Sequence, residues 1–179
     1  MWLLRLLGAD AAVLDGGIGA WRGELTTGIW TPPQPGEFTA RPWDPSGLAT
    51  IDDAATGRFV VDARASERYR GDVEPMDARA GHIPGALNLP FSGNLNADGH
   101  FLPPEQLAAR FRDLGVEDGA DVIMYCGSGV TACHNLIALE RAGFGRARLY
   151  PGSWSQYAGT ERPAATGDDP GARPVKPLR

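Results

Sequence analysis

Short apolar runs alternate with helical patterns through the second half of the chain. Apolar runs typical of buried strands occur at residues 59–62, 86–89, 121–125 and 146–150. Between these runs, Leu107, Phe111 and Leu114 recur at helical spacing within 103–114, and a second helical pattern covers 131–142. Strands that alternate with helices favour parallel pairing and right-handed crossovers. The pattern therefore predicts an α/β fold built around a parallel sheet.

Shorter elements are expected before this region and within it. Thr50 is a good N-cap for a short helix that ends near Gly57, and residues 65–70 can form a helical turn before a loop at 71–81. Residues 1–7 (MWLLRLL) are too short to span a membrane, and no longer apolar run follows them. We expect them to form a helix that packs against the rest of the protein.

The order of signals near the N-terminus is repeated further along the chain. In each copy a helical pattern ends at a glycine, a short apolar run follows, and a glycine turn leads to a tryptophan. Gly8 corresponds to Gly143, and Leu14 corresponds to Leu149, at one constant offset. The repetition predicts that residues 1–22 are the remnant of an N-terminal repeat, with a short strand that ends at Leu14.

Composition divides the rest of the chain into three parts. Residues 23–47 are rich in Pro, Thr and Gly without a sustained period, which is typical of an extended linker. Residues 48–160 contain all of the alternating elements and are expected to form the complete domain. Residues 161–179 form a polar tail, which we expect to be disordered at its end.

Charge and cysteine content argue against several kinds of partner and site. A net charge of -5 and an isoelectric point near 5.1 disfavour nucleic acid or an anionic membrane as a partner. The 2 cysteines do not make a disulfide framework, and the 3 histidines give little support to a structural metal site. These features favour a reducing compartment, and we expect the protein in the cytoplasm.

The most specific chemical signal is the junction between the strand at 121–125 and the helix at 131–142. Cys126 follows the strand, and Gly127 and Gly129 allow the backbone N–H groups to converge on one point as an anion-binding nest. The start of the next helix adds partial positive charge, and both features favour a nucleophilic thiolate. The alternative interpretation is a structural cysteine buried beside a tight turn.

Four motifs in this order resemble the mercaptopyruvate branch of the rhodanese family. They are DAR at 62–64, GHIPGA at 81–86, CGSGVTACH at 126–134 and YPGSW at 150–154. Members of this branch usually carry two rhodanese domains, and the C-terminal one bears the catalytic cysteine. The resemblance, which covers about residues 1–167, implies a C-terminal catalytic domain preceded by a truncated N-terminal one. It also implies a central parallel sheet with helices on both faces.

The resemblance implies a sulfur transfer in two steps. Cys126 would take a sulfur atom from 3-mercaptopyruvate, become a persulfide, and pass the sulfur to cyanide or to a thiol such as that of thioredoxin. No metal ion or organic cofactor is implied. Thiosulfate is the alternative donor, but Gly127 and Ser128 leave the loop neutral, which favours a mercaptan.

The resemblance also implies roles for particular residues. The persulfide and the substrate would be held by the loop residues Gly127, Ser128, Gly129, Val130 and Thr131. Arg68 stands where the family binds the carboxylate of the donor, and a guanidinium group suits that task. The family's second arginine lies in a Glu-Pro-Arg-like run. Here Met76 follows Glu74 and Pro75, so Arg79 is the nearest candidate.

Other residues of the motifs are expected to be structural. We expect Asp62 and Arg64 to brace the loop as an ion pair. His82 is expected to tie a loop together through hydrogen bonds, and Trp154 to pack beneath the catalytic loop. Cys133 is expected to be a core thiol, with a regulatory disulfide to the catalytic cysteine as the alternative.

Two other classes of function compete with sulfur transfer. Dual-specificity phosphatases have a related architecture, but they need an arginine six residues after the cysteine, where this chain has Ala132. An inactive rhodanese domain that acts as a binding or regulatory module is the remaining alternative. Exposure of the apolar N-terminal helix would also allow a homodimer.

Overall fold

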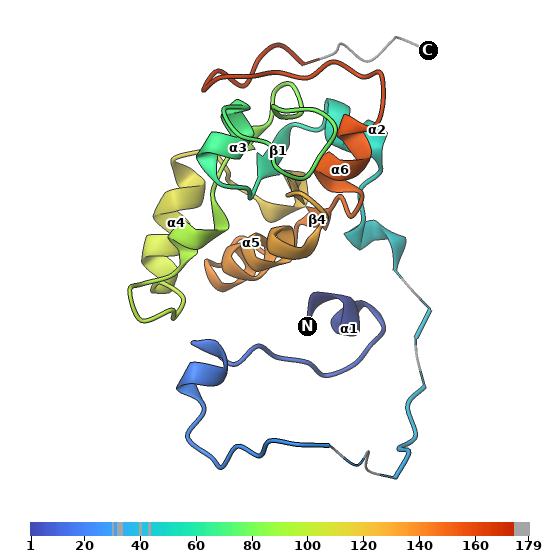
Figure 1. Cartoon of the computed structure of the whole chain (residues 1–179), viewed down its shortest axis with the longest axis vertical. Helices are drawn as coiled ribbons and strands as arrows, with labels where there is room; N and C mark the ends of the chain where they lie inside the picture. The colour runs from blue at the N-terminus through green and yellow to red at the C-terminus, as the bar shows by residue number, and fades with distance from the viewer. Residues whose placement is uncertain (30, 32–33, 40, 43, 174–179) are drawn as a thin grey trace.

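The structure is a computed structural model that describes residues 1–29, 31, 34–39, 41–42 and 44–173 (Figure 1). Four parallel strands form one sheet in the order β2-β1-β3-β4. The strands are β1 (Phe59–Asp62), β2 (Leu87–Asn88), β3 (Val122–Tyr125) and β4 (Arg148–Leu149). Each strand lies within one of the predicted apolar runs. The predicted α/β fold with a parallel sheet is therefore confirmed.

Six α-helices occur in the described part of the chain. They are α1 (Trp2–Leu6), α2 (Ile51–Thr56), α3 (Ser66–Arg70), α4 (Pro104–Arg112), α5 (Val130–Arg141) and α6 (Ser153–Ala158). Short 3-10 turns lie at Gly17–Ala20, Pro45–Gly47, Phe91–Asn94 and Gly119–Asp121. Thr50 caps α2 as predicted, in a capping box with Asp53. Among the helices described, none has the length and apolar character needed to cross a membrane.

Both faces of the sheet are covered by helices, as expected (Figure 1). Side chains of successive strand residues point to opposite faces, so each strand supplies two apolar surfaces. On one face Val61 and Met124 pack in a cluster with residues of α4 and α5. On the other face Val60 and Ile123 pack in a cluster with residues of α2 and α6. The sheet is thus the middle layer of a three-layer domain.

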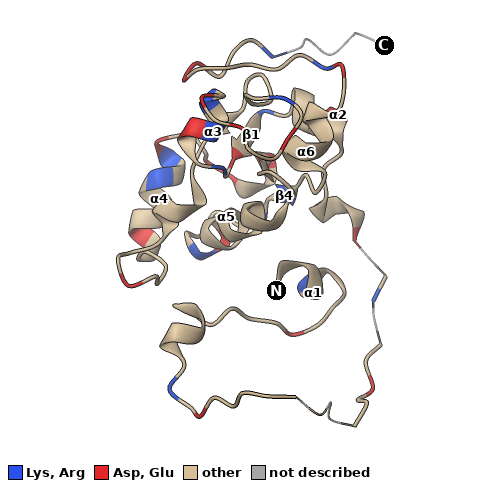
Figure 2. Cartoon of the chain, in the orientation of Figure 1, with Lys and Arg blue, Asp and Glu red and all other residues tan. Residues whose placement is uncertain are grey.

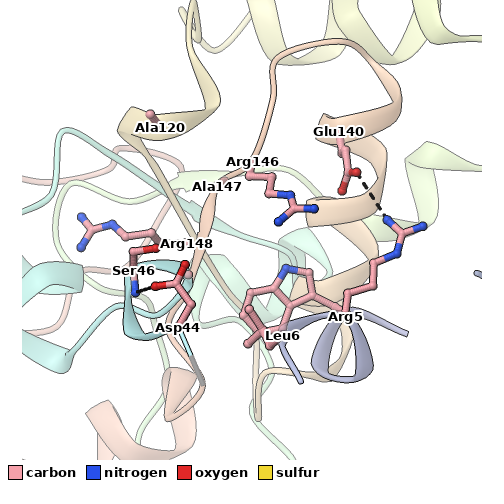
Figure 3. Close-up of a pocket in the computed structure, with 11 residues that line it drawn as sticks. Arg5, Leu6, Asp44, Ser46, Ala120, Glu140, Arg146, Ala147 and Arg148 are labelled. Atoms are coloured by element: carbon pink, nitrogen blue, oxygen red, sulfur yellow. Dashed lines mark hydrogen bonds and ion pairs between the residues drawn. The ribbon is translucent and has the colours of Figure 1, made fainter. Parts of the chain in front are cut away.

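The N-terminal segment packs against this domain through one side of α1. Trp2 packs on the core cluster that contains α5, whereas Leu3 is 52% exposed and Leu4 is 50% exposed. Arg5 reaches Glu140 of α5 at 3.4 Å across a pocket between α1 and the β4 region (Figure 3). The expectation of a packed helix is therefore met on one side only.

The short strand expected to end at Leu14 does not form. The residues around it have no regular secondary structure, and Leu14 is 47% exposed. A strand needs a neighbouring strand to pair its backbone groups, and β4 has β3 as its partner at the other end of the repeat. Apolar character alone therefore did not specify a strand at this position.

The C-terminal tail adds to the domain as far as residue 173. Ala165 forms an isolated antiparallel bridge with His82, with N–H to carbonyl distances of 2.9 and 3.0 Å. Arg173 donates to the carbonyl oxygen of Gly85 at 2.7 Å. The end that we expected to be disordered, residues 174–179, lies outside the described residues. Residues 161–173 are therefore held against the domain by individual hydrogen bonds.

Candidate active site

Cys126 lies at the carboxyl end of β3, and the start of α6 holds the backbone around it. The N–H group of Cys126 donates to the Oγ of Ser153 at 3.2 Å, and its carbonyl oxygen accepts from the N–H of Trp154 at 2.9 Å. The carbonyl oxygen of Gly127 accepts from the N–H of Ser155 at 2.9 Å. These contacts fix the cysteine at the edge of the sheet where α/β folds bind ligands.

The two glycines of the loop differ in what they require of the backbone. Gly129 has a φ of 81°, and a Cβ there would lie 3.0 Å from the carbonyl oxygen of Pro151. Gly127 has no positive φ, and the nearest atom to a Cβ there would be 3.7 Å away. Left-handed backbone is therefore needed at Gly129 but not at Gly127.

Several backbone N–H groups of the loop are unpaired within the described structure. Within the described part of the chain, the N–H groups of Gly127, Ser128 and Gly129 donate no hydrogen bond to another protein group. The first N–H groups of α5, which begins at Val130, have no partner inside the helix. Adjacent free N–H groups at a strand-to-helix turn are suited to an anion.

A pocket of about 300 Å³ opens beside Cys126. It is lined by Arg64, Ala65, Arg68, Met76, Asp77, Phe91, Cys126, Gly127, Ser128, Val130, Thr131 and Ser155. The side chain of Cys126 is buried, whereas Val130 is 73% exposed at the pocket. Of the loop residues singled out in the sequence, all except Gly129 line this pocket together with the cysteine.

Arg68 of α3 is the predicted arginine that reaches the loop. A Cβ placed on Gly127 would lie 3.7 Å from the Nη1 of Arg68, so the guanidinium group lies against the loop backbone. The Nη2 of Arg68 lies 2.6 Å from the Oε1 of Glu74 and 3.2 Å from the Oδ2 of Asp77. The Nε of Arg68 is buried and has no hydrogen-bond partner in the described structure. Charges of both signs therefore meet around α3 (Figure 2).

Arg68 is connected through Glu74 to a buried ion-pair network. The Nη2 of Arg64 lies 2.7 Å from the Oδ2 of Asp62, and its Nη1 lies 3.2 Å from the Oε2 of Glu74. The expected ion pair between Asp62 and Arg64 is confirmed. Burial alone would raise the pKa of Glu74, but hydrogen bonds from Arg68 and from two backbone N–H groups outweigh it. The pKa of Glu74 is lowered as a result, and its carboxylate stays charged between the two arginines.

Arg79 lies apart from the cysteine pocket. Its guanidinium group donates to the carbonyl oxygen of Arg162 at 2.7 Å and to that of Tyr157 at 3.4 Å. The indole N–H of Trp154 donates to the carbonyl oxygen of Arg79 at 2.9 Å. The structure therefore does not bring Arg79 together with Arg68, because the Arg79 side chain packs beside α6 instead.

His82 and Trp154 are structural, as expected. The Nδ1 of His82 lies 2.8 Å from the carbonyl oxygen of Tyr69, and its Nε2 lies 3.3 Å from that of Pro170. The imidazole ring also stacks on Tyr69 with the ring centroids 3.7 Å apart. Trp154 is completely buried in the core cluster beneath the loop. Both residues hold chain segments together, and neither lines the pocket.

Cys133 lies in the first turn of α5, four residues after Gly129. Its Sγ donates to the carbonyl oxygen of Gly129 at 3.3 Å, and the side chain is partly buried. Burial raises the pKa of the Cys133 thiol, and the charge of Cys126 raises it further. A thiol that resists deprotonation is a poor nucleophile, which fits the expected structural role.

Five residues of the site were not identified from the sequence: Ser153 and the pocket-lining Ala65, Asp77, Phe91 and Ser155. Ser153 lies in the YPGSW motif, whose tight turn was visible, but nothing in it indicated a hydroxyl that binds the Cys126 N–H. Asp77 and Phe91 lie in segments without periodicity, and only the folded chain brings them to the pocket. A departure from the family pattern at Met76 was the one sequence signal that this wall of the site is unusual.

Comparison with known proteins places the chain in a family. Residues 48–160 match the rhodanese-like domain, and this match covers more than half of the sequence. The chain therefore belongs to the rhodanese-like domain family. The match agrees with the four-stranded parallel sheet and with the position of Cys126 after β3.

Individual relatives agree with this assignment. The chain is 50% identical over 181 residues to a Pseudomonas aeruginosa protein named as a probable 3-mercaptopyruvate sulfurtransferase, and the match covers 93% of the chain and 62% of the relative. It is 43% identical to SseB of Mycobacterium tuberculosis, provisionally named as a thiosulfate sulfurtransferase, over 88% of the chain and 58% of the relative. The chain thus spans about six-tenths of the length of these relatives.

The fold resembles that of a sulfurtransferase whose structure has been solved. The 3-mercaptopyruvate sulfurtransferase from Leishmania major superposes with a TM-score of 0.75 and 32% sequence identity. The match covers 90% of this chain and 47% of that one.

Proposed function

We propose that this chain transfers sulfur through a persulfide on Cys126. The observation that supports the proposal most directly is the pocket beside Cys126. There a buried cysteine, a loop with free N–H groups and the guanidinium group of Arg68 surround one space. The names of the relatives point to the same activity.

In the first step the Cys126 thiolate attacks the sulfur of 3-mercaptopyruvate. A new S–S bond forms, and the C–S bond of the donor breaks with its electron pair going to carbon. The thiol proton of the donor ends on that carbon, so the products are pyruvate and an anionic persulfide on Cys126. The free N–H groups of the loop suit the negative charge of the terminal sulfur.

In the second step a thiol accepts the outer sulfur. The acceptor sulfur bonds to the terminal sulfur of the persulfide, and the S–S bond breaks with its electron pair returning to Cys126. The acceptor becomes a persulfide and the Cys126 thiolate is regenerated. The exposed position of Ser128 at the pocket suits a hydroxyl that hydrogen-bonds the donor or the incoming thiol. Thioredoxin, another thiol or cyanide could serve as acceptor.

The preferred donor in this proposal is 3-mercaptopyruvate rather than thiosulfate. Arg68 is the one predicted carboxylate-binding arginine beside the loop, and Gly127 and Ser128 add no positive charge. A donor with one carboxylate matches a single guanidinium group better than a dianion does. Thiosulfate remains the alternative donor, in line with the name of the Mycobacterium tuberculosis relative.

We also propose that the catalytic unit is larger than residues 48–160. The hydrogen bonds of Ala165 and Arg173 to the region around His82 support the inclusion of residues 161–173. Residues 1–22 are proposed to correspond to the end of an N-terminal repeat, joined by a linker at 23–47.

Release of pyruvate tests the proposed activity. The protein is incubated with 3-mercaptopyruvate and dithiothreitol, and pyruvate is measured over time. We expect turnover by the unmutated protein and by Cys133→Ser, but none by Cys126→Ser. The proposal would be contradicted if the unmutated protein released neither pyruvate from 3-mercaptopyruvate nor sulfite from thiosulfate.

A further inference from the structure

Asp77 lies in the wall of the Cys126 pocket and shares the guanidinium group of Arg68 with Glu74. The Nη2 of Arg68 contacts the Oε1 of Glu74 at 2.6 Å and the Oδ2 of Asp77 at 3.2 Å. Glu74 is 4% exposed and stands behind the pocket, whereas Asp77 is one of the residues that line it. The Asp77 carboxylate therefore borders the space that a sulfur donor would enter.

Carboxylates outnumber guanidinium groups around this pocket. Arg64 is 1% exposed and contacts both Asp62 and Glu74, so it is not available to a ligand. Arg68 contacts Glu74 and Asp77. Three carboxylates thus face two guanidinium groups beside the cysteine. In partly buried surroundings these charges act on a ligand more strongly than they would in water.

Arg68 nevertheless keeps donor groups for a ligand. Both carboxylates contact its Nη2, while its Nη1 lies beside Gly127 on the side of the catalytic loop. Its Nε has no hydrogen-bond partner in the described structure. A carboxylate that binds Arg68 from the pocket comes close to Asp77, because both share one guanidinium group. The negative charge of Asp77 therefore repels an anionic ligand that binds Arg68.

We infer that Asp77 is a specificity-determining residue that favours sulfur donors with one negative charge over donors with two. The inference rests on the proposed function and names the substrate class of the same site. A monocarboxylate with a neutral thiol has one charge for Asp77 to repel, whereas a dianion such as thiosulfate has two. Met76, at the position where the family pattern has a second arginine, adds no charge to offset Asp77.

Alkylation of Cys126 tests the effect of Asp77 without any need for turnover. The rates of modification by iodoacetate and by iodoacetamide are measured at Cys126 by peptide mass spectrometry. The two reagents differ by one negative charge, so their rate ratio reports the electrostatics of the pocket. A change in the reactivity of the thiol itself alters both rates equally and cancels. We expect Asp77→Asn to raise the iodoacetate to iodoacetamide ratio about three- to tenfold.

A matched control removes the same charge outside the pocket. Asp72 pairs with Arg70 and is 54% exposed, and we expect Asp72→Asn to change the ratio less than about twofold. Asp77→Ser serves as a second variant if Asp77→Asn does not fold. An unchanged ratio in a folded Asp77 variant would overturn the inference, as would an equal rise in Asp72→Asn.

Sulfur loading then separates this inference from the proposed function. We expect Asp77→Asn to speed the loading of Cys126 by thiosulfate more than loading by 3-mercaptopyruvate, by about threefold or more in relative rate. Equal changes for both donors would overturn the assignment of specificity to Asp77. If neither donor loads the unmutated protein, the proposed function fails, and the alkylation ratio still decides whether Asp77 controls the charge preference of the pocket.

Discussion

Ser153 links a strained backbone to Cys126. Its φ is 52°, the one positive φ outside glycine among the described residues. The buried Oγ accepts from the N–H of Cys126 at 3.2 Å and donates to the carbonyl oxygen of Tyr150 at 2.9 Å. Strain of this kind persists where surrounding contacts hold it, and it concentrates at functional sites.

Replacement of Ser153 separates the hydroxyl from the strain. Ser153→Ala leaves the Cys126 N–H without its partner, and we expect unfolding free energy to fall by about 1–3 kcal/mol. Ser153→Gly loses the same hydroxyl but relieves the left-handed backbone, so it should be more stable than the alanine variant by about 1 kcal/mol. Urea unfolding of both variants measures the difference. Equal stability of the two would show that the backbone is not strained there.

Some residues of the site could be predicted from the sequence because their immediate neighbours in the chain identify them. Cys126 stands between an apolar strand and glycines, and Arg64 and Asp62 form their ion pair within two positions of each other. Asp77 could not be predicted, because its contact with Arg68 depends on the path of a loop without periodicity. The position of Arg79 also depends on the course of a loop. The structure places its guanidinium group on the carbonyl oxygens of Arg162 and Tyr157 and not in the pocket.

At the scale of elements, the loop between β3 and α5 positions Cys126 and forms one wall of the pocket. Its two glycines provide a matched pair of variants. Gly129→Ala forces an L-residue into φ 81° and places a Cβ 3.0 Å from the carbonyl oxygen of Pro151, so we expect a loss of about 1–2 kcal/mol or more. Gly127→Ala meets Arg68 at an ordinary 3.7 Å, and stability should change by less than about 0.5 kcal/mol.

Thermal or urea unfolding of the two variants checks this distinction. Gly127→Ala also places a methyl group beside the guanidinium group of Arg68, so its donor KM should rise although its stability is retained. A larger loss of stability in Gly127→Ala than in Gly129→Ala would contradict the assignment of the turn to Gly129.

His134 makes α5 sensitive to pH. Burial lowers the pKa of His134 below its ordinary value of 6.5, and the charge of Arg110 lowers it further. The folded protein therefore binds a proton here less readily than the unfolded chain does. The neutral imidazole of His134 therefore contributes fully to the stability of the folded protein above pH 6.5. This contribution is lost as the pH falls below 6.5 toward the pKa of His134 in the folded state.

Removal of the imidazole should reduce this dependence. We expect His134→Gln to lose less unfolding free energy than the unmutated protein between neutral pH and about pH 5. Denaturant unfolding across this range measures the slope, and His100→Gln, at a 44% exposed side chain, is the control. An unchanged slope in His134→Gln would contradict the burial argument.

Element boundaries followed from sequence where periodicity or caps were strong. The helices at 103–114 and 131–142 and the cap at Thr50 agree with the structure. The helix α6 was not anticipated, because its 6 residues are too few to establish a period and its N-cap, Gly152, has no side chain to mark the start. The strand expected to end at Leu14 failed for a different reason: a strand also needs a partner.

At the scale of the whole molecule, the site depends on segments far apart in the sequence. Arg68 of α3, Asp77 of the following loop, Cys126 after β3 and Ser155 of α6 line one pocket. Parallel strands direct their carboxyl ends to the same edge of the sheet, so the fold class indicated where the site lies. It did not indicate which loop residues would complete it, because loop paths depend on packing.

Composition also did not predict the contacts of the tail. Its polar, Pro- and Gly-rich sequence gave no sign that Ala165 pairs with His82 or that Arg173 binds the carbonyl oxygen of Gly85. Individual hydrogen bonds to one surface, rather than an apolar pattern, hold this segment in place, and composition does not reveal them.

In the proposed reaction, Cys126 carries sulfur between a donor and an acceptor. Intact mass spectrometry after incubation with 3-mercaptopyruvate and no acceptor tests it most directly. We predict that the unmutated protein and Cys133→Ser gain the mass of one sulfur atom, that Cys126→Ser gains nothing, and that dithiothreitol removes the added mass. No added sulfur on the unmutated protein with either 3-mercaptopyruvate or thiosulfate, or equal loading of Cys126→Ser, would contradict the account.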